Sequence, residues 1–243
     1  MDIKIPYTPR KHQSYLHQQI ARYRWSVLVC HRRFGKTVCM INHLIKSALM
    51  CKHKNPRFAY IAPTFKQAKS IAWDYMKQFT AKIPATKFNE TELRVDLPNG
   101  SRITLLGAEN SDGLRGIYLD GCVIDEYANI DGKLFSEIIR PALSDRKGYC
   151  VFIGTPAGMN NNFYDLFQHA NGAEDWFNYK AKASQTKIVD PEELEKAKEV
   201  MGEKKYLQEF ECDWIANIEG AIYGDEMNKL DDKKQLARVP YDP

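Results

Sequence analysis

One run of residues combines the side chains and the spacing that binding of a nucleotide phosphate requires. It extends from Cys30 to Thr37 and reads Cys-His-Arg-Arg-Phe-Gly-Lys-Thr, the phosphate-loop pattern G-x-x-x-x-G-K-[ST] with Cys30 in place of the first glycine. Gly35 lets the backbone turn closely around a phosphate, so that amide N–H groups and the positive end of the following helix face the anion. The ammonium of Lys36 can then reach the β- and γ-phosphates, and the Thr37 hydroxyl can bind Mg²⁺. We predict that the ATP site includes His31, Arg32, Arg33, Phe34, Gly35, Lys36 and Thr37.

A second motif places two carboxylates at the end of another apolar run. Asp125 and Glu126 follow Cys-Val-Ile, which is typical of a buried strand. Ligands of an open parallel sheet bind at the carboxyl ends of its strands, so Asp125 is expected to face the same crevice as Lys36 and to hold Mg²⁺ directly or through water. Glu126 would polarise the attacking water as a general base. The pair favours hydrolysis over phosphate transfer to a hydroxyl, although two adjacent acids can also be a solvated helix cap.

A third apolar run, Val-Phe-Ile-Gly, ends at Gly154 and is followed by Thr155 and Pro156. In P-loop ATPases with an additional catalytic glutamate, such a strand lies between the strand that precedes the phosphate loop and the strand that precedes the acidic pair. Thr155 would then lie near the γ-phosphate and sense its loss. The alternative interpretation is an ordinary junction between a strand and a turn.

Three arginines and one glutamine are further candidates. A guanidinium can stabilise the charge that develops during phosphate hydrolysis, and Arg32 and Arg33 lie within the loop itself. Arg115 lies between glycines in Asp-Gly-Leu-Arg-Gly, which suggests an exposed loop able to reach the nucleotide of a neighbouring subunit. The Gln13 amide can pair with both a donor and an acceptor on an adenine edge. The alternative for each arginine is a surface charge or an ion pair. The alternative for Gln13 is a solvated helix start.

The elements that must position these residues alternate along the chain. We predict strands over 26–30, 58–62, 93–97, 102–107, 121–125 and 149–154, and helices over 11–23, 36–51, 65–79, 132–140 and 162–169. This alternation implies crossover connections and a mostly parallel sheet with helices on both faces. The Asn-Gly turn at 99–100 predicts an antiparallel hairpin inserted in the sheet or at its edge. The expected fold class is α/β: a three-layer P-loop NTPase of the additional-strand, catalytic-glutamate type.

The pattern changes after residue 172. A strand over 176–182 and two charged helices around Gly202 suggest a small C-terminal lid subdomain. The polar, proline-punctuated end suggests a linker. We therefore predict an ATPase core over residues 1–172, a lid over 173–220 and a linker over 221–243 that leads toward an absent nuclease domain.

Composition sets broad limits on the class of protein. The chain has 243 residues, is 44% hydrophobic and carries a net charge of +4, which permits contact with a polyanion without requiring it. Its six cysteines form no CxxC pair and no His/Cys cluster with metal-ligand spacing, which favours reduced, buried thiols. The sequence has no apolar run of the roughly 20 residues that a membrane span needs, so we expect an intracellular protein.

Together these motifs resemble the large subunit of tailed-phage terminases over residues 7–215. The matching segments are Pro9 and Gln13, the loop 31–37, Ala62-Pro63-Thr64, Leu114-Arg115-Gly116, Ile124-Asp125-Glu126 and Gly154-Thr155-Pro156. The arginine-bearing loop that ends in Gly-Lys-Thr is the most specific of them, whereas Ala62-Pro63-Thr64 is shared with superfamily-2 helicases.

The resemblance implies an ATPase motor that uses Mg²⁺ and translocates double-stranded DNA into a procapsid. Terminase large subunits dock as a ring on the capsid portal protein, work with a small terminase subunit and carry a C-terminal nuclease domain. The implied setting is the cytoplasm of an infected bacterial host, with the isolated domain able to remain a monomer of low activity. No residues remain after Pro243 to build a nuclease, so we expect hydrolysis of ATP without cleavage of DNA.

The resemblance also implies roles for single residues. Lys36 and Thr37 would bind nucleotide and Mg²⁺, Gln13 would contact adenine, and Glu126 would be catalytic. Gly154, Thr155 and Pro156 would couple hydrolysis to movement. Arg32 matches an arginine finger that acts within a subunit, and Arg115 matches one that acts across subunits, which we favour.

Two other functions remain open on the sequence. A superfamily-2-type helicase lobe would need a second lobe after Pro243 to supply an arginine finger. A non-hydrolysing DNA-binding or assembly subunit could use a degenerate phosphate loop as a scaffold, and Cys30 in place of glycine favours it slightly. The presence of Lys36, Thr37, Asp125 and Glu126 argues against the scaffold.

Overall fold

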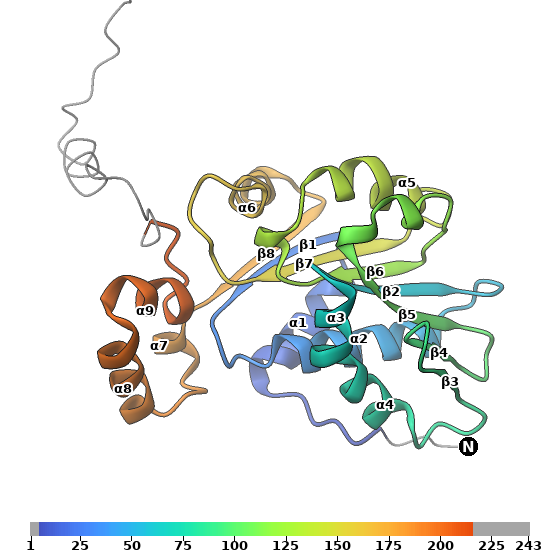
Figure 1. Cartoon of the computed structure of the whole chain (residues 1–243), viewed down its shortest axis with the longest axis horizontal. Helices are drawn as coiled ribbons and strands as arrows, with labels where there is room; N and C mark the ends of the chain where they lie inside the picture. The colour runs from blue at the N-terminus through green and yellow to red at the C-terminus, as the bar shows by residue number, and fades with distance from the viewer. Residues whose placement is uncertain (1–4, 216–243) are drawn as a thin grey trace, which may run out of the picture.

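The computed structural model describes residues 5–215, in which strands and helices alternate (Figure 1). The strands are β1 (Trp25–Cys30), β2 (Arg57–Ala62), β3 (Lys87–Asn89), β4 (Arg94–Asp96), β5 (Arg102–Gly107), β6 (Gly121–Ile124), β7 (Tyr149–Gly154) and β8 (Trp176–Ala181). The α-helices are α1 (Lys11–Ile20), α2 (Lys36–Met50), α3 (Phe65–Ala68), α4 (Asp74–Thr80), α5 (Arg140–Ala142), α6 (Asn162–Gly172), α7 (Ala183–Thr186), α8 (Pro191–Met201) and α9 (Glu203–Phe210). The predicted α/β class is confirmed.

All eight strands belong to one sheet, in the order β3-β4-β5-β2-β6-β7-β1-β8. Neighbours from β5 to β8 pair in parallel, and β4 is antiparallel to both β3 and β5. The predicted hairpin is therefore β4–β5, next to the edge strand β3. Strand β7 lies between β6 and β1, as predicted. The ends of the three strands that carry the candidate motifs therefore lie next to one another.

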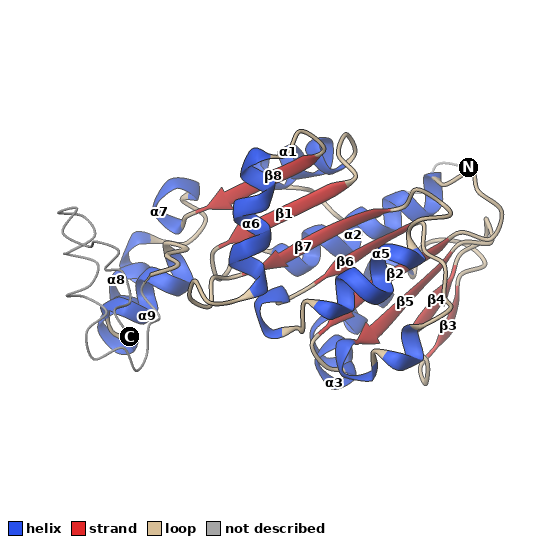
Figure 2. Ribbon diagram, turned by 90° about the horizontal axis from the view of Figure 1, so that it is seen from above, coloured by secondary structure: helices blue, strands red, loops and turns tan. Residues whose placement is uncertain are grey.

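Helices cover both faces of the sheet, and each face has its own core (Figures 1 and 2). Along β1, Leu28 and Cys30 point into the core formed with α1, α2 and α4, whereas Val27 and Val29 point into the core formed with α5 and α6. A strand that is buried on both sides must be apolar at every position, which explains the continuous run that precedes the phosphate loop.

The position of β8 differs from the predicted division of the chain. This strand pairs in parallel with β1 along its whole length, from Trp25 opposite Trp176 to Cys30 opposite Ala181. The boundary predicted at residue 172 therefore falls within the part of the chain that builds the sheet. Helices α7, α8 and α9 lie beyond the carboxyl ends of β1 and β8 (Figure 2), and the predicted linker 221–243 lies outside the described residues.

Two of the predicted helices contain a π-helical segment. Lys69–Trp73 is π-helical between α3 and α4, and Leu134–Ile139 is π-helical before α5. The apolar spacing that predicts a helix does not fix which hydrogen-bond ladder forms, so this feature could not be read from the sequence. Strand β3 and helix α7 were not predicted, since three and four residues carry too little periodicity.

All six cysteines are free, and five of them are buried. Among the described residues, none of the helices has the length and apolar character needed to cross a bilayer.

Candidate active site

The phosphate loop connects β1 to α2 and closes around its own lysine. Gly35 is the N-cap of α2 with φ of 87°, a left-handed conformation that favours glycine. A Cβ atom there would also lie 2.9 Å from Gln13 Nε2. The Lys36 ammonium donates to the carbonyl oxygens of Cys30 at 3.0 Å and His31 at 3.4 Å. Gly35 therefore makes the left-handed turn at the start of α2, and binding of phosphate by the loop stays a prediction.

Cys30, His31 and Phe34 are fully buried, so their side chains support the loop from behind. His31 Nε2 lies 2.7 Å from the Thr186 hydroxyl and its Nδ1 lies 2.6 Å from the Arg32 carbonyl oxygen. Burial is the main cause that lowers the pKa of His31 and raises that of the Cys30 thiol. Any contact of His31 or Phe34 with a nucleotide must come from the main chain. The Arg33 side chain is exposed, and its φ of 70° bends the backbone before Phe34.

Gln13 is buried behind the loop, with both ends of its amide bonded to the main chain. Its Oε1 accepts from the Arg10 amide at 2.9 Å, and its Nε2 donates to the Gly35 carbonyl oxygen at 3.2 Å. The Arg10 guanidinium donates to the Phe34 carbonyl oxygen at 3.3 Å. The start of α1 is thus fastened to the phosphate loop, and contact of Gln13 with adenine stays a prediction.

Asp125 lies at the end of β6 in a network with residues of two other elements. It is 4% exposed, and its carboxylate accepts from the Tyr60 hydroxyl of β2 and from the Glu126 amide at 2.9 Å. Burial and the neighbouring Asp125 charge raise the pKa of Tyr60. Burial raises the pKa of Asp125, while Tyr60 and Lys36 act in the opposite direction. Tyr60 of β2 thereby holds the carboxylate of Asp125, one of the two predicted Mg²⁺ ligands.

Glu126 turns out of the strand with φ of 48° and ψ of 45°. This left-handed conformation is uncommon for a residue other than glycine and costs of order 1 kcal/mol or more. Burial and the charge of Asp125 raise the pKa of Glu126, whereas Lys36 and Arg32 lower it. The two carboxylates and Lys36 therefore act on one another at the same edge of the sheet.

The residues after β7 contact the C-terminal helices. Gly154 ends β7, and the Gln208 amide of α9 donates to the Pro156 carbonyl oxygen at 2.5 Å. Thr155 is half-buried at the tip between the loop-bearing strand and the acid-bearing strand. Its predicted sensing of the γ-phosphate remains a prediction.

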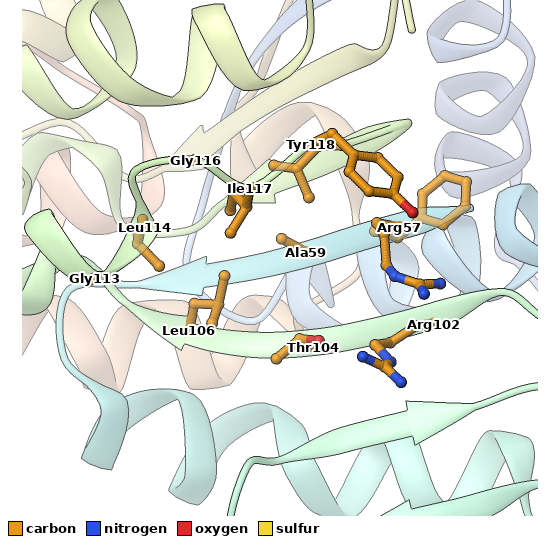
Figure 3. Close-up of a pocket in the computed structure, with 12 residues that line it drawn as sticks. Arg57, Ala59, Arg102, Thr104, Leu106, Gly113, Leu114, Gly116, Ile117 and Tyr118 are labelled. Atoms are coloured by element: carbon orange, nitrogen blue, oxygen red, sulfur yellow. The ribbon is translucent and has the colours of Figure 1, made fainter. Parts of the chain in front are cut away.

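Arg115 lies in the segment that returns from β5 to β6. This segment covers a cavity of about 320 Å³ whose lining includes Leu106, Gly113 and Tyr118 (Figure 3). The Arg115 guanidinium is outside that lining and lies 3.9 Å from the Glu137 carboxylate, with 58% of the side chain exposed. An exposed position agrees with the predicted loop, and its action on a neighbouring nucleotide remains a prediction.

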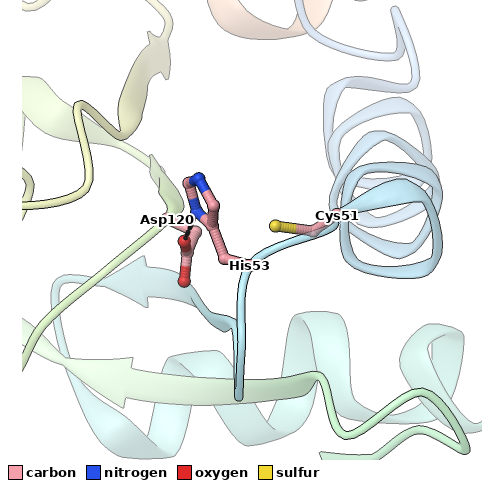
Figure 4. A group of neighbouring side chains, drawn as sticks. All are labelled: Cys51, His53 and Asp120. Carbon is pink, nitrogen blue, oxygen red and sulfur yellow. Dashed lines mark hydrogen bonds and ion pairs between the residues drawn. The ribbon is translucent and has the colours of Figure 1, made fainter.

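A cluster of Cys51, His53 and Asp120 lies at the opposite, amino edge of the sheet (Figure 4). Asp120 Oδ1 is 2.6 Å from His53 Nδ1, and Oδ2 accepts from the Arg57 amide at 2.7 Å. Arg146 also lies 3.7 Å from Oδ1. Because these groups already satisfy the carboxylate, we interpret the cluster as a structural tie between the starts of β2 and β6.

Sequence reasoning missed Tyr60, Thr186, Gln208 and Glu209, all of which contact predicted site residues. A tyrosine inside an apolar parallel strand needs a partner for its hydroxyl, which was an available cue for Tyr60. The residues of α7 and α9 come near the loop only through the fold, because β8 returns the chain to the same edge.

The fold and these motifs define a P-loop NTPase of the additional-strand type. A family model described as terminase large subunit, T4likevirus-type, N-terminal, matches residues 29–229, and the chain belongs to this family. The large terminase subunit of Thermus virus P23-45 is 32% identical over 126 residues, which is 44% of this chain and 26% of that protein. The matched region thus spans about a quarter of the curated relative.

Solved structures show the same fold. The large terminase ATPase domain of Thermus phage P74-26 superposes with a TM-score of 0.72 at 22% identity, covering 86% of this chain and 95% of that chain. The large terminase of a thermophilic bacteriophage in complex with ATP-gamma-S superposes with a TM-score of 0.71 at 14% identity, covering 84% of this chain and 52% of that chain.

The hydrogen bond between Tyr60 and Asp125 should contribute measurably to the free energy of unfolding. We expect Tyr60→Phe to lower the free energy of unfolding by about 1–3 kcal/mol, because it leaves a buried carboxylate without one of its donors. Tyr149→Phe is the matched control, since its hydroxyl bonds only a neutral group, Ser47 Oγ, at 3.1 Å. Denaturant unfolding at neutral pH compares the two; equal losses would show that the Tyr60 contact has no special weight.

Proposed function

We propose that this chain hydrolyses ATP with Mg²⁺ as the motor domain of a DNA-packaging terminase. The observation that carries the proposal is the meeting of four groups at one edge of the sheet. Lys36 and Thr37 come from the start of α2, and Asp125 and Glu126 come from the end of β6. Lys36 lowers the pKa of both carboxylates, against the effect of burial, which raises it.

The donor set fits a magnesium ion. Thr37 and Asp125 offer hydroxyl and carboxylate oxygens, the ligands that this hard cation prefers. Burial raises the pKa of Asp125, so a cation beside it would favour the ionised form. When bound, Mg²⁺ would supply charge neutralisation for the β- and γ-phosphates.

The chain's own residues would carry the remaining steps. Backbone N–H groups of the loop and Lys36 would hold the phosphates and fix the γ-phosphate in position. The Glu126 carboxylate would orient a water and accept its proton. Arg32, whose charge already acts on Glu126, would help to stabilise the charge that develops on the phosphoryl oxygens, in addition to Arg115 of a neighbouring subunit as the main finger.

The pH dependence of hydrolysis should report Glu126. The general base must be ionised, and burial together with Asp125 raises its pKa above the ordinary glutamate value. Activity should therefore rise with pH through an acid limb that lies above the usual glutamate range. The measurement is a profile of kcat/KM between about pH 4 and 9, the range in which glutamate and histidine side chains ordinarily titrate. An acid limb at or below the ordinary value would contradict it.

The wider role follows from family membership and is part of the proposal. The motor would act on double-stranded DNA, form a homo-oligomeric ring on the capsid portal protein, and work with a small terminase subunit in the cytoplasm of the infected bacterial host. An isolated domain would be a monomer of low activity. The matched region covers 26% of the curated relative, so the activity and partners of the whole protein belong to this proposal.

Arg115 gives a test of subunit cooperation. If its exposed guanidinium acts on a neighbouring site, turnover per subunit should rise with protein concentration, and Arg115→Ala should abolish that rise. The rate per subunit over a dilution series is the measurement, with Arg140→Ala as a control on an exposed arginine of α5. A flat wild-type series would favour Arg32 as the main finger.

A further inference from the structure

Helix α9 ends against the phosphate loop and touches it through its main chain. The Arg32 amide donates to the Glu209 carbonyl oxygen at 2.7 Å. Amide groups of a phosphate loop ordinarily point toward the anion. The Arg32 amide instead donates to a carbonyl oxygen of the protein. The contact places the side chain of Glu209 beside the loop.

Several further bonds fix the end of α9 in that place. Gln208 donates to the Pro156 carbonyl oxygen, and the Cys212 thiol lies 3.2 Å from the Ala181 carbonyl oxygen at the end of β8. The Glu211 carboxylate accepts from the Ser184 hydroxyl at 2.6 Å and from the Ser184 amide at 3.1 Å. The position of Glu209 is therefore set by bonds to the neighbouring elements.

The Glu209 carboxylate lies among the charges of the site. Its side chain is 13% exposed, and its oxygens lie 3.9 Å from the Arg32 guanidinium and 3.1 Å from the Lys205 ammonium. Glu209 and Arg32 act on Glu126 in opposite directions, Glu209 raising its pKa and Arg32 lowering it. Arg32 is 61% exposed and would otherwise have wide rotamer freedom.

We propose that Glu209 is a positioning residue that holds the Arg32 guanidinium beside the phosphate loop and repels the bound triphosphate. This inference rests on the proposed ATPase function and adds a residue from the C-terminal helices to its machinery. The Glu209 carboxylate restricts the positions that the Arg32 guanidinium can take. This restriction favours stabilisation of the transition state. The same negative charge weakens binding of a nucleotide that carries several negative charges of its own.

The variant Glu209→Gln should change kcat and nucleotide affinity in opposite directions. Glu209→Gln keeps the main-chain bond to Arg32 and the size of the side chain, but removes the charge. We expect kcat to fall by about tenfold, because Arg32 is no longer held in place. Nucleotide affinity should rise by about threefold, because one nearby negative charge is gone. A merely structural defect would lower both quantities.

The experiment measures phosphate release and binding of a fluorescent ATP analogue with Mg²⁺ for the wild type and a set of variants. The variants are Glu209→Gln, Glu209→Asp, Arg32→Ala and the double variant Arg32→Ala/Glu209→Gln. Glu203→Gln is the matched control, because Glu203 lies on the same helix but pairs with Lys198 at 3.5 Å. Glu209→Asp should restore part of kcat, and Glu209→Gln should change kcat little once Arg32 is absent.

Three results would overturn the inference: unchanged kcat in Glu209→Gln, a fall of kcat together with weaker binding, or additive losses in the double variant. Absence of turnover by the wild type would instead count against the proposed function. The two failures are therefore distinguishable.

Discussion

Replacing Glu126 by glutamine should lower the rate of phosphate release by about 100-fold or more, while ATP with Mg²⁺ still binds. The amide keeps the size of the side chain but cannot accept a proton from water. Asp125, Lys36 and Thr37 remain in place, so the contacts expected to hold the triphosphate and the metal are preserved. The measurement is a steady-state phosphate-release assay combined with equilibrium nucleotide binding.

Two comparisons make the Glu126→Gln result decisive. Glu199→Gln changes an exposed glutamate of α8 and should leave the rate within the error of the assay. The acid limb of the pH profile should also disappear from any residual activity of Glu126→Gln. Equal rates for Glu126→Gln and the wild type would favour a scaffold that binds nucleotide without using this carboxylate.

Replacing Lys36 by alanine should weaken nucleotide binding and slow turnover together. The ammonium now bonds the carbonyl oxygens of Cys30 and His31, so it lies inside the curve of the loop where the β- and γ-phosphates would bind. Loss of its charge-assisted hydrogen bonds should weaken ATP binding by about 100-fold and lower the rate by a similar factor or more. Isothermal titration with an ATP analogue measures the first effect.

The control for Lys36→Ala is Lys52→Ala, which removes an exposed lysine just after the end of α2. Since Lys36 also closes the loop on itself, thermal unfolding of the free protein should be compared for both variants. Retained ATP affinity in a folded Lys36→Ala protein would place the nucleotide somewhere other than the phosphate loop.

The sequence was sufficient to predict the order of the main elements and the strand that separates the loop from the acids. Each of those features depends on local signals: the apolar runs of β1, β6 and β7, and the Gly-Lys-Thr start of α2. A strand buried on both faces must be apolar throughout, so its pattern shows directly in the residues. The parallel arrangement then places the ends of those strands at one edge.

The predicted boundary after residue 172 did not anticipate that β8 is an edge strand of the sheet. Trp176–Ala181 is half-buried along much of its length, so its composition resembles that of a peripheral element. Pairing between β8 and β1 joins residues about 150 positions apart. Local periodicity cannot predict a contact over that separation. The contacts of Thr186, Gln208 and Glu209 with the loop follow from that pairing, which is why they were missed.

Tyr60 was missed for a different reason. It lies on β2, which the sequence predicted correctly, but its role depends on which neighbour β2 pairs with. Because β2 pairs with β6, the Tyr60 hydroxyl lies close enough to donate to Asp125 at the end of that strand. The identity of neighbouring strands is a property of the whole sheet and not of either strand alone.

The most direct test of the nucleotide site is a crystal structure of this chain with Mg²⁺ and a non-hydrolysable ATP analogue. The β- and γ-phosphates should lie within hydrogen-bonding distance of Lys36 Nζ, with Mg²⁺ on the Thr37 hydroxyl and on Asp125, directly or through water, and Glu126 facing a water beside the γ-phosphate. A nucleotide bound at the opposite edge of the sheet, in the cavity of about 530 Å³ lined by Arg22 and Lys46, would contradict the assignment.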